Sequence, residues 1–163
     1  MPKPPPTKVL SIPQIARWAN DARRKRKTIV VTNGCFDLLH YGHVSYLQRA
    51  KRLGDLLVVG INGDASVHAL KGPARPLVPE KQRAAVIAAL GCVDAVVIFK
   101  EPRANKFFNA VRPDVYVKAG DYRIDTLETG ERVLLQSLGA KIKILPFVKG
   151  FSSTKLIEKI RQS

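Results

Sequence analysis

The segment TNGCFDLLHYGH, residues 32–43, links a short apolar run to a stretch with helical periodicity. The apolar run, Thr28–Thr32, is rich in β-branched residues and is apolar on both faces, which is typical of a buried parallel strand. The stretch after it, Val44–Leu53, repeats its apolar residues at the helical period. The order strand, loop, helix predicts the unit from which parallel sheets are built.

The rest of the chain continues this alternation. Further strands are predicted at Leu56–Ile61, Ala95–Phe99, Val115–Val117 and Ile142–Leu145. Further helices are predicted at Glu80–Leu90, Arg103–Val111 and Thr126–Leu138. Strands that alternate with helices imply right-handed crossovers. The sequence therefore predicts an α/β fold with a doubly wound, five-stranded parallel sheet and helices on both faces.

The N-terminal part is predicted to add one helix to this sheet. Residues 1–10 are interpreted as a flexible tail, and residues 11–163 as a single domain. Ser11 and Gln14 form a capping-box pattern at the start of a helix over residues 11–26. Trp18 falls on the apolar face of this helix, so we expect it to pack on the domain.

Charge is the unusual feature of the composition. The 163 residues include 28 basic and 13 acidic side chains, a net charge of +15. Such a charge suits nucleic acid or a polyphosphate substrate, while the run Arg23–Lys27 at a helix end is interpreted as a solvated face.

No apolar run approaches the ~18 residues of a membrane span, and no signal peptide is recognised. We expect a cytoplasmic protein in which Cys35 and Cys92 are reduced.

Two histidines around a glycine open the helix after the first strand. Free backbone amides at a helix start favour an anion, and Gly42 allows the backbone to approach a ligand closely. Imidazoles at His40 and His43 can donate hydrogen bonds to phosphate oxygens that gain charge in a transition state. A zinc site would need further ligands, and the remaining histidine, His68, is predicted to lie exposed in a helix.

These residues carry a resemblance to a known family. The pattern Gly34-x-Phe36-Asp37-x-x-His40-x-Gly42-His43 resembles the signature of the cytidylyltransferase-like nucleotidyltransferases, which have an HxGH motif on a Rossmann-like fold. A second segment, Gly150–Thr154, resembles the Ser/Thr motif with which that family holds the β- and γ-phosphates.

Within that family the chain is most similar to the heptose 1-phosphate adenylyltransferases, from about Lys27 to Arg161. The strings that carry this similarity are 32–47, 59–67, 70–76, 117–122 and 145–147. The resemblance implies transfer of AMP from ATP to D-glycero-β-D-manno-heptose 1-phosphate, which gives pyrophosphate and ADP-heptose for lipopolysaccharide precursors. In many bacteria this activity is fused behind a sugar kinase, and the chain is interpreted as a stand-alone form.

The resemblance also implies roles for individual residues. The catalytic residues are expected to be His40, His43 and Lys71, the last in a flexible loop. The nucleotide is expected to contact Asn33, Gly34, Cys35, Phe36, Gly42, Gly120, Asp121, Ser152, Ser153 and Thr154. The sugar phosphate is expected to contact Asp37, Arg75 and Arg83. Mg²⁺ is expected with ATP, although no protein ligand is assigned to it; Asp37 could serve or could instead hold its loop. A homodimer is the family expectation.

Two positions depart from the family pattern. Ala119 stands where glycine is frequent, and Lys149 stands where an acidic residue is frequent. Relatives that use CTP and glycerol phosphate carry arginine at the position of Phe147, so Phe147 favours the adenylyltransferase branch.

Three alternative functions stay open on the sequence. The first is a CTP-dependent cytidylyltransferase acting on glycerol 3-phosphate or another polyol phosphate, which shares the same motifs. The second is a basic nucleic-acid-binding protein, although no nucleic-acid-binding motif is recognised. The third is a nucleotide sensor without activity, which the presence of both phosphate motifs disfavours.

Overall fold

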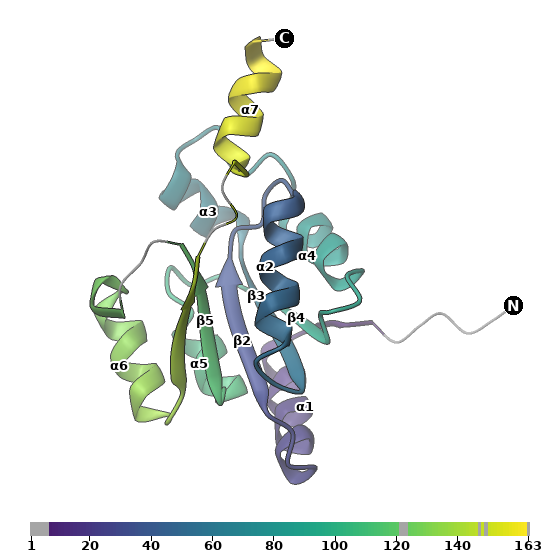
Figure 1. The fold of residues 1–163 in the computed structure, drawn as a ribbon, viewed down its shortest axis with the longest axis vertical. Coiled ribbons are helices and arrows are strands. Elements are labelled where there is room, and N and C mark those ends of the chain that lie inside the picture. The colour runs from purple at the N-terminus through teal and green to yellow at the C-terminus, as the bar shows by residue number, and fades with distance from the viewer. Residues whose placement is uncertain (1–6, 121–123, 147, 149, 163) are drawn as a thin grey trace, which may run out of the picture.

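A six-stranded, wholly parallel sheet forms the centre of the protein (Figure 1). The computed structural model describes residues 7–120, 124–146, 148 and 150–162. The strands, in the spatial order β1-β4-β3-β2-β5-β6, confirm the predicted doubly wound α/β fold. Their bounds are β1 Val9–Leu10, β2 Ile29–Gly34, β3 Leu56–Asn62, β4 Ala95–Phe99, β5 Val115–Ala119 and β6 Lys141–Leu145.

The sixth strand corrects the prediction of five. Val9 and Leu10, which the sequence placed in the tail, pair in parallel with Val96 and Val97 of β4. The ammonium group of Lys8 donates hydrogen bonds to the carbonyl groups of residues 90 and 93, at 3.2 and 2.7 Å. A strand of two residues has no detectable periodicity, so only tertiary pairing reveals it.

Helices cover both faces of the sheet (Figure 1). One face carries α1, α5 and α6, and the other carries α2 and α4. The bounds are α1 Ile12–Arg24, α2 Tyr41–Lys51, α3 Asp64–Lys71, α4 Glu80–Ala88, α5 Asn105–Val111, α6 Thr129–Ser137 and α7 Ser153–Gln162, with a 3₁₀ turn η1 at Ile124–Thr126. Each face encloses its own apolar core, one around Phe107, Phe108 and Tyr116 and the other around Leu47, Leu57 and Ile87.

Helix α1 begins as its sequence predicts. The Ser11 hydroxyl accepts from the Gln14 amide at 3.4 Å, and the Gln14 side chain accepts from the Ser11 amide at 2.8 Å. Trp18 packs against the core on its face of the sheet, as expected. The helix ends at Arg24, two residues earlier than predicted, because Arg26 has a left-handed backbone with φ of 54°.

The strand order places a switch point beside β2. From β2 the chain moves to β3 and then β4 on one side, and later to β5 and β6 on the other side. In such sheets ligands bind outside the carboxyl ends of the strands, where the direction of winding changes. A site is therefore expected at the carboxyl ends of β2 and β5, the switch-point crevice of this fold class. Over the described ranges, no helix is long and apolar enough to cross a membrane.

Candidate active site

The N-terminus of α2 lies at this crevice and has no side-chain cap. His40 occupies the N-cap position with an extended backbone, φ −141° and ψ 171°. Its carbonyl group accepts from the amides of His43 and Val44, at 2.9 and 3.3 Å, and so begins the helix. The first amides of α2 lack a capping side chain, and helix-start amides of this kind attract an anion.

The rings of His40 and His43 stack on one another at this helix start. Their centroids lie 3.9 Å apart, and Phe36 packs against His43 at 5.3 Å. Burial, helped by the nearby His40, lowers the pKa of His43 to about 4, against a backbone interaction with Leu38 that raises it. Burial also lowers the pKa of His40. Both rings are therefore neutral near pH 7.

Each ring also has one nitrogen shielded from solvent. The Nδ1 atoms of His40 and His43 are buried, and neither has a hydrogen-bond partner in the described part of the chain. The Nδ1 of His40 faces Gly42, where a Cβ atom would lie 3.0 Å from it. A buried donor without an acceptor is costly, so the proton of neutral His40 belongs on Nε2.

The start of α7 is packed against the same loop (Figure 1). A Cβ atom at Gly42 would lie 2.9 Å from the Cβ of Phe151, which explains why this position requires glycine. The Ser153 hydroxyl donates to the Leu38 carbonyl at 3.2 Å. These contacts bring the predicted phosphate segment, Ser152–Thr154, beside the histidine pair, although the two lie more than a hundred residues apart in sequence.

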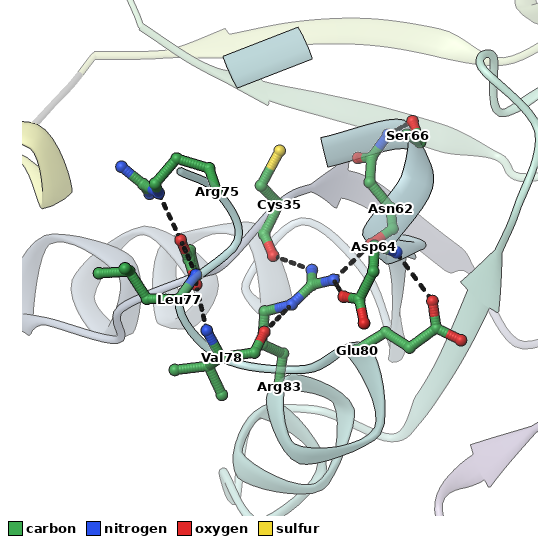
Figure 2. A network of polar contacts seen from close by, with 10 residues as sticks. Cys35, Asn62, Asp64, Ser66, Arg75, Leu77, Val78, Glu80 and Arg83 are labelled. Carbon is green, nitrogen blue, oxygen red and sulfur yellow. Dashed lines mark hydrogen bonds and ion pairs between the residues drawn. The ribbon is translucent and has the colours of Figure 1, made fainter. Parts of the chain in front are cut away.

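Arg83 has a different role from the one predicted (Figure 2). Its side chain is fully buried, and its guanidinium donates to the carbonyl groups of Val78, Cys35 and Asn62 and to the carboxylate of Asp64. The guanidinium is buried and its three nitrogens already donate within the protein, so it presents no exposed edge to a sugar phosphate. The expectation that Arg83 binds the sugar phosphate is therefore corrected: Arg83 joins the loops after β2 and β3 to α4.

Asp37 holds a loop and does not face a ligand. Its carboxylate accepts from the amides of Leu77 and Val78, at 2.9 Å each, and from Nε of Arg75 at 2.6 Å. Burial would raise the pKa of Asp37, but these amides and the Arg75 guanidinium together lower it. Asp37 is thus an anion fixed beneath the loop of residues 72–79. The expectation that it contacts the sugar phosphate is corrected, and the alternative that it holds a loop is confirmed.

Arg75 keeps a guanidinium edge for a ligand. Asp37 engages only its Nε atom, and the described residues supply no hydrogen bond to its two terminal amino groups. Lys71 is exposed at the last position of α3, so it lies at a helix end and not in the flexible loop that the sequence predicted.

Several of the other predicted nucleotide residues lie at or near the carboxyl ends of β2 and β5. The Asn33 side chain accepts from the hydroxyl of Tyr116 at 2.7 Å, across the switch point. Gly120 is buried with φ of 132°, and its amide donates to the Leu145 carbonyl at 2.9 Å. The side chain of Phe36 is a core residue that supports His43, so it does not face a ligand. Asp121, Phe147 and Lys149 lie outside the described residues.

Sequence reasoning missed two cations at the site. Lys118, in β5, lies half-buried at the crevice; the only signal was a lysine inside an otherwise buried strand. Arg49, in α2, donates to the Pro146 carbonyl at 2.7 Å and so ties the segment before α7 to α2.

The described side chains do not fit a resident metal. No group of three or more His, Cys, Asp or Glu side chains within the described ranges could hold a metal ion. Asp37, the carboxylate considered for Mg²⁺, is engaged by backbone amides and Arg75.

The fold, the uncapped α2 and the stacked histidines define a class of doubly wound α/β proteins with an anion-attracting helix start at the switch point, and a family model agrees. The model described as cytidylyltransferase-like matches residues 31–159. The chain therefore belongs to the cytidylyltransferase-like family.

Curated relatives resemble the chain over most of its length. The bifunctional protein HldE of Koribacter versatilis is 55% identical over 145 residues, which are 89% of this chain and 29% of that protein. The bifunctional protein HldE of Syntrophotalea carbinolica is 51% identical over 138 residues, which are 85% of this chain and 28% of that protein. The chain thus spans less than a third of the length of these relatives.

Two solved structures have folds similar to that of this chain. A lipopolysaccharide core biosynthesis protein from Thermoplasma volcanium has a TM-score of 0.63 and 30% identity, covering 77% of this chain and 99% of that one. A pantoate–β-alanine ligase from Francisella tularensis has a TM-score of 0.58 over 96% of this chain and 78% of that one. At 18% identity, the second similarity concerns the fold alone.

Proposed function

We propose that the chain transfers AMP from ATP to a sugar 1-phosphate and releases pyrophosphate. The observation that carries the proposal is the neutral, stacked pair His40 and His43 at an uncapped helix start, beside the N-terminus of α7. Two helix starts and two imidazoles that converge on one crevice suit a polyphosphate. Membership of the cytidylyltransferase-like family supports the same reaction class.

The proposed reaction is a single in-line displacement. An oxygen of the sugar 1-phosphate attacks the α-phosphorus of ATP, and the bond from that phosphorus to the bridging oxygen of the β-phosphate breaks. Pyrophosphate leaves with the electron pair, and the product is a nucleoside diphosphate sugar. Such a transfer depends on positioning and charge stabilisation more than on acid–base chemistry.

The histidines would act as neutral hydrogen-bond donors in this step. With its proton on Nε2, His40 can donate to an oxygen of the α- or β-phosphate, and His43 lies 3.9 Å from it, ring to ring. Their donation grows stronger as charge develops on the phosphates. Serine and threonine hydroxyls of Ser152–Thr154 and the start of α7 would hold the leaving pyrophosphate.

Positive side chains around the crevice would hold the rest of the substrates. Lys71, exposed at the end of α3, would reach the phosphates. The free edge of the Arg75 guanidinium suits a sugar phosphate, which it can grip with two hydrogen bonds. Because the described side chains form no metal site, we assign Mg²⁺ to the nucleotide phosphates.

We further propose heptose 1-phosphate as the sugar phosphate. The HldE relatives are 51% and 55% identical over most of this chain, and the neighbour from Thermoplasma volcanium is titled a lipopolysaccharide core biosynthesis protein. ADP-heptose for lipopolysaccharide would be the product. The homodimer and the cytoplasmic location expected from the sequence stay predictions, which sedimentation and cell fractionation would test.

The deciding experiment is pyrophosphate release with defined substrate pairs. ATP or CTP is supplied with Mg²⁺ and either heptose 1-phosphate or glycerol 3-phosphate. We expect turnover only with ATP and heptose 1-phosphate. Turnover with CTP and glycerol 3-phosphate would show that the proposed substrates are wrong and that the proposed type of reaction is right. No release with any pair, from folded protein, would refute the proposal and favour a binding function such as nucleic-acid binding.

A further inference from the structure

A lysine lies where β5 reaches the switch point of the sheet. Lys118 is the fourth residue of β5, two residues before Gly120, and its side chain is half-buried. β5 pairs with β2 on one side and with β6 on the other, so Lys118 belongs to an interior strand. The carboxyl ends of β2 and β5 form the crevice in which a ligand is expected. A ligand in this crevice would therefore lie beside Lys118.

The ammonium group of Lys118 has no protein partner within the described ranges. No hydrogen bond reaches it, and no carboxylate lies within 4.0 Å of it. Glu131 is the acidic residue whose charge acts on it, but the Glu131 carboxylate accepts from the Ala104 amide at 2.8 Å. A half-buried charge without a partner lowers stability, so this lysine is retained at a cost.

The surrounding charges indicate what the ammonium group would bind. Burial lowers the pKa of Lys118, Glu131 and Cys35 raise it, and the positive charge of Lys71 lowers it further. Lys71 and Lys118 come from different sides of β2, and the positive charge of Lys71 nevertheless acts on Lys118. An anion between two such lysines would remove their repulsion and restore the solvation that burial takes from Lys118.

We propose that Lys118 binds a phosphate oxygen of a substrate in the crevice. The proposal rests on the proposed function, in which both substrates carry phosphate. Nucleotide phosphate and sugar phosphate share the chemistry that an ammonium group recognises, and separate binding measurements distinguish them. Lys118 thereby joins Lys71 as a second cation of the phosphate site, from the opposite side of β2.

The test compares three variants. Lys118→Met removes the charge and keeps a side chain of similar length, and Lys118→Arg keeps the charge. Lys143→Met removes an exposed lysine from β6 and serves as the matched control. Calorimetry gives the Kd for ATP with Mg²⁺, and pyrophosphate release gives the KM for the sugar phosphate. We expect Lys118→Met to raise either the Kd for ATP or the KM for the sugar phosphate about tenfold or more. Lys118→Arg should recover part of the loss, and Lys143→Met should match the wild type.

The constant that changes identifies the source of the phosphate. A raised Kd for ATP assigns Lys118 to the nucleotide, and a raised KM alone assigns it to the sugar phosphate. If neither constant changes, the proposal is overturned.

Thermal unfolding separates binding from a structural role. Because the ammonium group is half-buried without a partner, Lys118→Met should unfold at the same temperature as the wild type or higher. A lower unfolding temperature, together with weaker binding of both substrates, would mean that Lys118 holds the fold, and this result too would overturn the proposal.

Failure of the proposed function can be told apart from failure of this inference. If the wild type releases no pyrophosphate with any pair, calorimetry with inorganic triphosphate still tests Lys118, and a tenfold loss in Lys118→Met would support it. If the wild type is active and Lys118→Met equals it in both constants, the nucleotidyltransferase stands and the role of Lys118 falls.

Discussion

His40 and His43 stack ring on ring, with Phe36 packed against His43, and the burial of this pair sets its charge. Two imidazoles with centroids 3.9 Å apart cannot both be protonated without repulsion. Burial is the largest cause: it lowers the pKa of both rings, so the neutral forms prevail near pH 7. The site thus offers polar donors and leaves positive charge to nearby lysine and arginine side chains.

Removal of His43 should impair the chemical step. We expect His43→Ala to lower kcat by roughly 10²–10³, the usual loss for a donor to a transition-state phosphate or oxyanion. Circular dichroism should show an intact fold. His68→Ala is the control, because His68 is exposed on α3. A His43→Ala protein with wild-type kcat would refute the mechanism.

The low pKa of His43 predicts how stability depends on pH. Its folded-state pKa is about 4, and an unfolded histidine titrates near ~6.5. Below ~6.5 the unfolded chain therefore binds a proton that the folded chain does not, so stability falls as the pH drops from there to about 4. Above ~6.5 this contribution is constant.

Proton NMR can follow the ring of His43 directly, and denaturation at several pH values can follow the stability. His43→Gln should show a weaker loss of stability between pH ~6.5 and 4 than the wild type. A His43 ring that titrates near ~6.5 in the folded protein would contradict the prediction.

Arg83 is expected to contribute to the free energy of unfolding and not to contact the substrate. Its loss would leave three carbonyl groups and the Asp64 carboxylate without their donor. We expect Arg83→Met to lower the free energy of unfolding by roughly 3 kcal/mol, as measured by urea denaturation. Arg17→Met, on the exposed side of α1, is the control. An unchanged free energy of unfolding would contradict the structural role of Arg83.

The sequence could reveal the histidine pair but not the buried role of Arg83. HxGH is a local pattern, and its loop can be interpreted without a partner segment. Arg83, by contrast, looks like an ordinary charged helix residue. The available signal was its position four residues before Ile87, on the face of α4 that is buried. Its acceptors lie on loops that only the tertiary structure brings to it.

At the level of elements, α1 shows how far local rules reach. Both hydrogen bonds of the capping box form as the residue types predict. Ser11→Ala should lower the unfolding free energy by about 1 kcal/mol, because one helix-start amide loses its acceptor. Thermal denaturation would measure the shift, with activity unchanged. Ser137→Ala, whose hydroxyl bonds a carbonyl in the last turn of α6, is the control that should change less.

The contact between α2 and α7 gives a prediction about geometry. In Gly42→Ala the new methyl group would lie 2.9 Å from the Cβ of Phe151, closer than such atoms approach, so α7 must shift. We expect a loss of activity of about tenfold or more, because a small misplacement of positioning groups is costly. Gly91→Ala, where nothing lies within 4 Å, is the control. Full activity in Gly42→Ala would show that α7 need not pack there.

Element boundaries at the site were harder to predict than the elements. The sequence predicted that the strand corresponding to β2 ends at Thr32, but Asn33 and Gly34 continue its pairing with Gly60 and Ile61 of β3. Polar and glycine residues do not show a strand pattern, and the neighbouring strand determines their conformation. Likewise α2 begins three residues before the predicted Val44, because its first turn carries the site and not the apolar period.

For the whole molecule, the net charge of +15 matches substrates that are both anions. A positive field speeds the encounter with anionic substrates, and salt screens it. We expect kcat/KM for both substrates to fall as salt rises from ~0.05 to ~0.5 M, with kcat changing less. Steady-state kinetics at several salt concentrations would measure it. A kcat/KM that is independent of salt would leave the charge without a role in catalysis.

The clamp of Asp37 on Leu77 and Val78 has a consequence for hydrogen exchange. Residues 72–79 form a surface connection, and most such amides exchange with heavy water within moments. The amides of Leu77 and Val78, however, donate to a buried carboxylate. They should keep their protons far longer than the rest of the loop and mark, by mass spectrometry, every event that opens it. In the Asp37→Asn variant, these two amides should exchange as fast as the other amides of the loop.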